Sequence, residues 1–307
     1  MRLPAEWEPH ERTLMGWPCR LELWGETIDQ ARADYATVAN AIAEFEPVTM
    51  IANPGADAAQ ARAACGVRVE IAELPLDDSW LRDCGPIYVY DEEGHRLATH
   101  FRFNAWGEKF DVWDRDAGVG PLIGELLGDE VRSAPIVLEG GSILGDGAAT
   151  LLTTEQCLLH PNRNPALSRE EIASVLLEFL GAERVVWLGR GLVEDRDTDG
   201  HVDLIASFTE PGRVLLQTVV ASYLNLYLCN GAVIVPVCGA DTDSDALGLL
   251  GQAFPERQVV AVPGAVLAYG GGGPHCITQP VPLRHGRPAQ AAHSVPAATI
   301  TGSNSAA

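Results

Sequence analysis

The sequence predicts an α/β fold in which strands outnumber helices and do not alternate with them one for one. Short apolar runs rich in β-branched residues recur along the chain, separated by only a few amphipathic helical segments. This pattern does not favour a parallel, doubly wound sheet. The polar hot spots Asp83, Glu139, His201 and Cys276 are 56, 62 and 75 residues apart in a chain of 307 residues. One fifth of the chain is roughly 61 residues, enough for a few strands and a helix, so a radial arrangement of repeats fits the chain.

The predicted elements follow from periodicity, composition and end signals. The strands are expected at Pro47–Ala52, Val67–Leu74, Ile87–Tyr90, Leu97–Phe103, Ile136–Leu138, Thr150–Leu152, Val185–Leu188, Val202–Phe208, Val214–Thr218, Ala232–Val237 and Gln258–Val262. The helices are expected at Ile28–Glu44, Val119–Leu127, Ser168–Leu180 and Asp243–Ala253. Ser168 and Glu171 form the pattern of a capping box at the start of the third helix.

The stretch from Val214 to Gly239 carries no charged residue. Its apolar runs are interrupted by polar residues and Pro236, and they fall short of the roughly 20 residues that a membrane span needs. Asn230-Gly231 is a strong hairpin dipeptide. We therefore expect two buried strands with a turn at this dipeptide and no membrane segment.

No Pro/Ser-rich linker interrupts residues 1–285, which predicts one catalytic domain. Residues 286–307 lack apolar periodicity and are typical of a disordered or loosely docked tail. Hydrophobic residues make up 47% of the chain, so a sizeable core can form.

The chain is strongly acidic, with 42 Asp and Glu against 21 Lys and Arg. This balance disfavours nucleic acid and anionic membranes as partners. It would concentrate a small cation, although acidic charge also simply maintains solubility. The seven cysteines are scattered without a Cys-x-x-Cys pair, which predicts a reducing, cytoplasmic compartment and no disulfide framework. Homo-oligomerisation is left open.

Cys276 follows His275 and four consecutive glycines in the stretch Tyr269 to Pro282. Glycines let a ligand approach the main chain closely, and a thiolate is a strong nucleophile when its surroundings lower its pKa. The alternative is a small buried hydrophobe, which we assume for the other six cysteines. The local context favours catalysis for Cys276.

Three other stretches carry candidate polar groups. Asp83 lies beside Arg82 in Leu76–Pro86, where Asp77 and Asp78 are typical turn formers. Glu139 ends an apolar strand before two glycines and is costly to bury unless it meets a charge. His201 and Asp203 are two residues apart, so a strand would present them on one face.

Metal and phosphate binding are weaker interpretations of these residues. The His, Cys and Asp sets lack zinc-type spacing, and a site would have to assemble from distant loops. The four glycines are followed by neither Lys-Ser/Thr nor a G-x-G-x-x-G pattern that opens a helix. We expect no metal and no cofactor.

A planar cationic substrate explains a cysteine, a histidine and several carboxylates together. A guanidinium pairs bidentately with carboxylates, which would hold its central carbon beside the thiolate. The histidine would protonate the departing ammonia and then activate water, and a carboxylate behind it would fix its tautomer.

The chain resembles the agmatine deiminase family of the guanidine-modifying superfamily, which is related to bacterial-type peptidylarginine deiminases. The resemblance runs in order along nearly the whole chain up to about Pro282. The motifs are Pro4–His10, Trp80–Pro86, Leu138–Gly141, Thr198–Asp203, Ser222–Tyr227, Asn230–Pro236 and His275–Gln279.

The resemblance implies a five-bladed α/β propeller of pentein type, built from pseudo-five-fold ββαβ modules. It also implies Cys276 as the nucleophile, His201 as the acid/base and Glu139 as the partner of the histidine. The resemblance further implies that Asp83 and Asp203 clamp the guanidinium. Three positions are similar to those that line the substrate's alkyl-amine end: Trp80, Asp197 and Gly271.

Two departures bear on the substrate. Gly273-Pro274 replaces the family's usual Asn-Ile before the His-Cys pair, and Leu204 replaces the usual Asn after the His-x-Asp unit. The expected reaction is hydrolysis of the guanidine of agmatine to N-carbamoylputrescine and ammonia through a covalent cysteine thiouronium. The alternatives are the same chemistry on arginine, peptidylarginine or a specialised-metabolite guanidine, an amidinotransferase, or a catalytically silent protein that binds polyamine-like cations.

Overall fold

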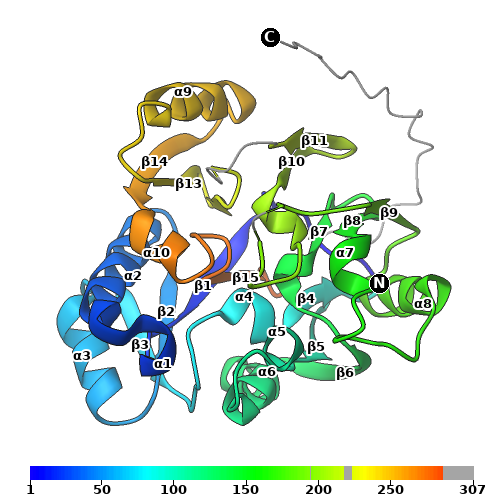
Figure 1. The fold of residues 1–307 in the computed structure, drawn as a ribbon, viewed down its shortest axis with the longest axis horizontal. Helices are drawn as coiled ribbons and strands as arrows, with labels where there is room; N and C mark the ends of the chain where they lie inside the picture. The colour runs from blue at the N-terminus through cyan, green and yellow to red at the C-terminus, as the bar shows by residue number, and fades with distance from the viewer. Residues whose placement is uncertain (194, 218–222, 286–307) are drawn as a thin grey trace.

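The computed structural model describes residues 1–193, 195–217 and 223–285 (Figure 1). The predicted tail, 286–307, lies outside the described residues. The strands are β1 His10–Gly16, β2 Val48–Ala52, β3 Val69–Glu73, β4 Ile87–Tyr90, β5 Arg96–Arg102, β6 Glu130–Val137, β7 Ile143–Gly145, β8 Thr150–Thr154, β9 Arg184–Leu188, β10 Ala206–Glu210, β11 Arg213–Leu216, β12 Tyr227–Cys229, β13 Ala232–Val237, β14 Gln258–Pro263 and β15 Thr278–Pro282. The helices are α1 Leu21–Trp24, α2 Ile28–Ile42, α3 Ala56–Ala64, α4 Leu81–Cys84, α5 Ala105–Glu108, α6 Asp114–Leu127, α7 Glu155–Leu158, α8 Arg169–Leu180, α9 Asp243–Ala253 and α10 Ala265–Tyr269. Three 3-10 turns complete the described elements: η1 Gly25–Thr27, η2 Gly140–Ser142 and η3 Val202–Leu204.

The described strands form five sheets, and three of them repeat one plan. In these three, an antiparallel pair is followed by a parallel strand: β4-β5-β6, β7-β8-β9 and β12-β13-β14. Helices α6, α8 and α9 connect the second strand to the third. The sheet β15-β1-β2-β3 has the same antiparallel-then-parallel start, but its first strand comes from the other end of the chain. The fifth sheet is the antiparallel pair β10-β11.

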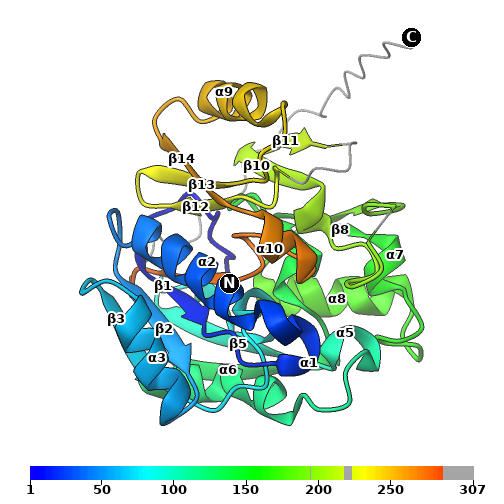
Figure 2. The ribbon, with the colours of Figure 1, turned by 60° about the vertical axis from the view of Figure 1, so that its left-hand side comes forward.

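The longer helices lie outside the sheets, and the short helix α4 lies near the middle (Figures 1 and 2). The largest cluster of buried apolar side chains extends from α2, β1 and β2 to Trp80 and Cys276. The core therefore supports the loop that carries the candidate nucleophile. Within the described part of the chain, no helix combines the length and the apolar character needed to span a bilayer.

Most predicted segments overlap observed elements. Ser168 caps α8 and forms the expected capping box with Glu171. The turn at Asn230-Gly231 joins β12 to β13, and Gly231 has the positive φ of 78° that such a turn requires. In the uncharged stretch, β11 overlaps the predicted strand Val214–Thr218 but pairs in another sheet, and β12 is a third strand that was not predicted.

The prediction of one strand over Val202–Phe208 is wrong in its first half. Residues Val202–Leu204 form the 3-10 turn η3, and β10 begins only at Ala206. The chain enters this turn through Asp199 and Gly200, whose φ angles are 63° and 97°. His201 and Asp203 therefore do not share the face of a strand.

Candidate active site

Four of the predicted residues occupy equivalent places in the topology. Asp83 lies in α4 just before β4, and Glu139 caps η2 just before β7. His201 caps η3 before β10, and Cys276 lies two residues before β15. Each residue thus belongs to the short turn that leads into the first strand of a sheet. Because these turns meet near the middle of the molecule, the four side chains come together.

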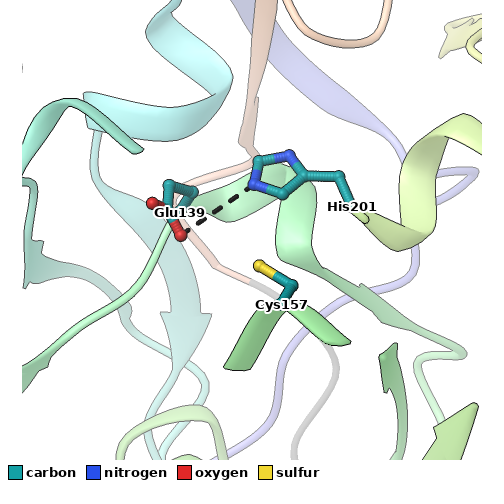
Figure 3. Close-up of side chains that lie close together, drawn as sticks. All are labelled: Glu139, Cys157 and His201. Carbon is teal, nitrogen blue, oxygen red and sulfur yellow. Dashed lines mark ion pairs between the residues drawn. The ribbon is translucent and has the colours of Figure 1, made fainter. Parts of the chain in front are cut away.

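His201 lies at the centre of three carboxylates. Its Nδ1 is 3.9 Å from Oδ1 of Asp83 and 3.9 Å from Oδ1 of Asp203. Its Nε2 is 3.9 Å from Oε2 of Glu139 (Figure 3). The imidazole is fully buried, and neither ring nitrogen has a hydrogen-bond partner among the described residues. Buried polar atoms are usually paired, so this arrangement indicates a place for a ligand.

Hydrogen bonds from neighbouring residues fix the two aspartates of the expected clamp. Trp106 Nε1 donates to Oδ2 of Asp83, and the Gly141 N–H donates to Oδ1, each at 2.9 Å. Asp203 Oδ2 accepts from Nδ1 of His275 at 2.8 Å. Its Oδ1 is buried and has no partner in the described part of the chain.

Cys276 is buried beside Asp203. Its Sγ is 3.4 Å from Asp203 Oδ2, and Nδ2 of Asn225 donates to the sulfur at 3.1 Å. Burial raises the pKa of the Cys276 thiol well above its ordinary value, and the charges of Asp203 and Asp83 raise it further. The thiol is therefore protonated in the unliganded site. A cation between these carboxylates would remove their unfavourable field and favour the thiolate.

The pKa values of the other ionisable groups of the site are also shifted. Burial alone would lower the pKa of His201, but Asp83, Cys157 and Glu139 raise it well above its ordinary value. Burial raises the pKa of Asp83, and the neighbouring carboxylates add to that rise. Burial would also raise the pKa of Glu139, but Arg163 and His201 lower it instead. The histidine is thus charged at neutral pH and able to donate a proton.

Two glycines give the site its room. A Cβ on Gly141 would lie 2.7 Å from Nδ1 of His201, 2.8 Å from Asp83 and 2.9 Å from Asp203. A Cβ on Gly272 would lie 3.0 Å from Sγ of Cys276 and 2.7 Å from the ring of Trp80. Side chains at either position would occupy the space between the reactive groups.

The three residues expected at the substrate tail lie near the nucleophile loop. Asp197 and Gly271 line a cavity that also contains Asn225, the residue bonded to Cys276. Gly271 has a φ of 101°, and a Cβ there would lie 3.2 Å from Asp197. Trp80 packs beneath the loop and stacks on Trp24, with ring centroids 5.9 Å apart.

The sequence interpretation missed four residues that the structure places in the site: Trp106, Arg163, Asn225 and His275. Arg163 is the charge that meets Glu139, with Nε 2.6 Å from Oε1. Asn225 lies in the turn before β12, the same topological place as the other site residues. His275 bridges Asp203 and Glu6, whose carboxylate oxygen is 3.2 Å from Nε2. Asn225 and His275 lie inside the quoted motifs Ser222–Tyr227 and His275–Gln279, whereas Trp106 and Arg163 lie outside every quoted motif.

One group of residues has the composition of a metal site. Potential ligand atoms of Glu139, Cys157 and His201 lie within 4.8 Å of one another, and all three side chains are buried. The Arg163 guanidinium pairs with Glu139 and places a positive charge against this group. This charge disfavours a metal cation at the same place.

Comparisons with known proteins agree with this geometry. The sequence profile of the Porphyromonas-type peptidyl-arginine deiminases matches residues 2–220 and 216–282. Agmatine deiminase of Stutzerimonas stutzeri is 37% identical, over 91% of this chain and 95% of that protein. Agmatine deiminase of Pseudomonas aeruginosa is 36% identical, over 92% of this chain and 95% of that protein.

Solved structures give the same result. Agmatine deiminase of Enterococcus faecalis superposes with a TM-score of 0.88 at 31% identity, over 92% of this chain and 96% of that chain. A dimethylarginine dimethylaminohydrolase superposes with a TM-score of 0.56 at 16% identity, which shows a shared fold alone. From the extent of these matches, the chain belongs to the Porphyromonas-type peptidyl-arginine deiminase family and is a homologue of the agmatine deiminases.

Proposed function

We propose that this protein is an agmatine deiminase, a hydrolase that converts agmatine to N-carbamoylputrescine and ammonia. The observation that carries the proposal is the buried thiol of Cys276 beside Asp203, next to a histidine ringed by carboxylates with unpartnered oxygens. Homologues named agmatine deiminase cover more than nine tenths of the chain.

The guanidinium binds between Asp83 and Asp203, where it neutralises two buried charges. Oδ1 of Asp203, which has no partner among the described residues, would accept from a guanidinium nitrogen, and the carboxylates would fix the plane of the group. Binding of the cation favours the thiolate of Cys276, to which Asn225 already donates. The substrate thereby assists the ionisation of its own nucleophile.

The thiolate then adds to the central guanidine carbon and forms a tetrahedral adduct. His201, held charged by Asp83 and Glu139, donates a proton to one amino nitrogen, and the C–N bond breaks as ammonia leaves. The remaining thiouronium is covalently bound to Cys276. The neutral His201 takes a proton from water, whose oxygen adds to the same carbon. The C–S bond then breaks, the departing sulfur of Cys276 takes up the hydroxyl proton of the adduct, and the neutral ureido product is released with His201 charged again.

Asp197 supports agmatine as the substrate. Its carboxylate lines the cavity that leads from Asn225 beside the nucleophile, together with Gly271. An alkyl chain in this cavity would place a terminal ammonium near Asp197. In this proposal Trp80 shapes the floor of the cavity through its contact with the glycine loop.

The arrangement of the sheets supports a five-bladed α/β propeller that spans residues 1–285 as one domain. Five described sheets each begin next to a site residue, and β15 pairs with β1 so that the two ends of the chain share one sheet. A ring of modules closed in this way directs one polar residue per module to the centre.

The test is release of ammonia and ureido product from agmatine, arginine and a blocked arginine peptide. Turnover of agmatine alone, abolished in Cys276→Ala, is the expected result. Cys65→Ala is the matched control, because it removes a free thiol that does not line this cavity. Turnover of another guanidine would keep the reaction and change the assigned substrate. Transfer of the amidino group to an amine would make the protein an amidinotransferase. Binding of agmatine without turnover of any guanidine would contradict the proposed reaction.

A further inference from the structure

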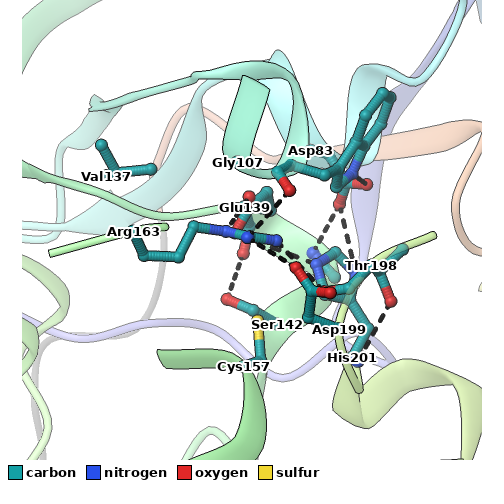
Figure 4. A network of polar contacts seen from close by, with 12 residues as sticks. Asp83, Gly107, Val137, Glu139, Ser142, Cys157, Arg163, Thr198, Asp199 and His201 are labelled. Atoms are coloured by element: carbon teal, nitrogen blue, oxygen red, sulfur yellow. Dashed lines mark hydrogen bonds and ion pairs between the residues drawn. The ribbon is translucent and has the colours of Figure 1, made fainter. Parts of the chain in front are cut away.

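Arg163 is a fully buried guanidinium that belongs to the protein itself. Nε donates to Oε1 of Glu139 at 2.6 Å, and NH2 donates to the Thr198 carbonyl at 3.1 Å. NH1 donates to the Trp106 carbonyl at 2.9 Å and to Oδ2 of Asp199 at 2.9 Å, as Figure 4 illustrates for the network around it. The side chain has no exposed surface, so none of these bonds competes with water.

These contacts join three separate segments that carry the site. Glu139 faces His201, and Trp106 donates its indole N–H to Asp83. Thr198 and Asp199 directly precede Gly200 and His201 in the chain. Trp106 and Asp199 have positive φ angles of 57° and 63°, which are rare for such residues and need support from their surroundings.

Arg163 also sets the charge around Glu139. The ionisable groups that face Glu139 are Arg163, His201, Cys157 and Asp83. Those that face His201 are Asp83, Asp203, Glu139 and Cys157. Without the guanidinium, Glu139 would be a buried carboxylate among other carboxylates and would favour its protonated form. A protonated Glu139 no longer stabilises the imidazolium of His201.

We propose that Arg163 is a positioning residue, which keeps Glu139 ionised and fixed so that Glu139 can in turn orient and stabilise charged His201. This inference rests on the proposed function for its kinetic consequence, but not for its structural one. Arg163 does not line the cavity at Asp197 and Gly271, so it acts on the reaction step rather than on the binding of the substrate tail.

The kinetic test compares Arg163→Met with Lys109→Met. Lys109 pairs with the same Asp199, at 2.8 Å from Oδ1, but its described contacts do not include Glu139. In Arg163→Met we expect kcat for agmatine to fall at least about tenfold, and by no more than the roughly 10²–10⁴-fold that general acid–base catalysis contributes. KM should change little, and the acidic limb of kcat/KM should move to higher pH. Lys109→Met should leave that limb in place.

Arg163→Lys keeps the positive charge but not the fork of donors, so it should restore the position of the acidic limb better than it restores kcat. Arg163→Lys also serves if Arg163→Met does not fold. An unmoved limb in both Arg163 variants, or an equal movement in Lys109→Met, would overturn the positioning role.

A titration separates this inference from the proposed reaction. The carboxyl of Glu139 can be followed by ¹³C NMR in protein that carries Cys276→Ala, with Glu139→Gln to assign its signal. Addition of Arg163→Met should raise the pH at which Glu139 titrates, whereas addition of Lys109→Met should not. An unchanged titration would overturn the inference even if the wild-type protein turns over agmatine. A raised titration would support it even if no guanidine is turned over.

Discussion

Two buried acidic clusters lie close together in this chain, and they differ in how their carboxylate oxygens are hydrogen-bonded. The first, which we call the catalytic cluster after its proposed role, consists of Asp83, Glu139 and Asp203 around His201. The second, which we call the Asp78–Asp116 cluster, lies behind the Trp24–Trp80 stack and is accompanied by Arg20. All five carboxylates are buried.

In the Asp78–Asp116 cluster every carboxylate oxygen accepts a hydrogen bond. Oδ2 of Asp78 accepts from the indole of Trp80 at 2.9 Å, and Oδ1 accepts from Trp24 and from Ser79. The two oxygens of Asp116 accept from the backbone N–H groups of Asp77 and Asp78. These carboxylates thus shape the loop before α4 and hold the two indoles.

In the catalytic cluster, by contrast, four polar atoms have no hydrogen-bond partner among the described residues: Asp203 Oδ1, Glu139 Oε2 and both ring nitrogens of His201. Unpaired buried polar atoms cost folding free energy, and folded proteins keep them where they serve a purpose. Single unpaired atoms also occur elsewhere among the described residues, including Nε of Arg20 beside the Asp78–Asp116 cluster. The difference between the clusters is that unpaired carboxylate oxygens and imidazole nitrogens converge in the catalytic one, which points to a ligand there.

The largest effect is expected for Asp203→Asn. The amide oxygen can still accept from His275, while the amide nitrogen takes the place of the unpaired Oδ1, so the fold keeps its bond. The charge that holds the guanidinium is lost, and we expect kcat/KM for agmatine to fall about 10²–10³-fold, as for removal of one preorganised electrostatic contact. Steady-state kinetics and thermal unfolding measure the two effects separately. If Asp203→Asn lost as much thermal stability as Asp78→Asn, the result would contradict the assignment of Asp203 to substrate binding rather than to support of the fold.

A somewhat smaller effect is expected for Gly141→Ala. The added methyl would lie within 3 Å of His201, Asp83 and Asp203, where the guanidinium is expected to bind. Displacement of reacting groups by about 1 Å can cost on the order of 10²-fold in rate. Gly118→Ala in α6 is the control, because an added Cβ there meets open space. Equal kcat/KM in Gly141→Ala and the wild-type protein would argue that the substrate lies elsewhere.

Local motifs and their similar spacing selected the members of the catalytic cluster, and the structure brings these residues together; their catalytic role stays a prediction. The same regularity contained a further signal. The interval of 75 residues between His201 and Cys276 is longer than the others, and it contains two described sheets, β10-β11 and β12-β13-β14, where each of the others contains one. The turn before the second of these sheets carries Asn225, which contacts the nucleophile. A search of the long interval for a polar residue before a strand would have found it.

The remaining features depend on contacts that the sequence does not display. Arg163 meets Glu139 and Asp199 from positions 24 and 36 residues away, and no periodicity connects them. Asp78 was taken as a turn former, but it accepts from two tryptophans that belong to different segments. The strand expected at Val202–Phe208 began too early, because the left-handed residues before His201 and the turn at Val202–Leu204 override the β-branched composition.

Asp78→Asn should reduce stability more than activity. Each oxygen of Asp78 faces an N–H donor, so the amide nitrogen of asparagine must meet one of them without an acceptor. A buried unsatisfied donor costs about 1–3 kcal/mol, which should appear as a lower midpoint of urea unfolding. Asp77→Asn, at the more exposed neighbouring position, serves as the control. Unchanged unfolding of Asp78→Asn would mean that the indole contacts add nothing to stability.

The smallest effect concerns pH, and there the Asp78–Asp116 cluster should act in the opposite direction to Glu139 and Asp203 of the catalytic cluster. Burial raises the pKa of Asp78 to about 6 and that of Asp116 to about 7, from an ordinary 3.8. The folded protein then binds more protons than the unfolded chain between about pH 4 and 7, so this cluster stabilises the fold at low pH and loses that contribution as the pH rises. Glu139 and Asp203 have lowered pKa values, so their contribution is present at neutral pH and is lost only in more acidic solution.

Urea unfolding at pH 5 and at pH 8 measures this difference. Asp116→Asn removes one of the two raised carboxyl groups, so its stability should change less between the two pH values than that of the wild-type protein, by on the order of 1–3 kcal/mol. Asp203 has a lowered pKa and stays ionised across that window, so Asp203→Asn should alter the difference between pH 5 and pH 8 only through His275, whose raised pKa depends in part on Asp203. If the two variants gave the same pH dependence, the excess protons of the folded state would have to reside outside the Asp78–Asp116 cluster. The carboxylates of both clusters would then be equally charged at neutral pH, and hydrogen bonding alone would separate the catalytic cluster from its structural neighbour.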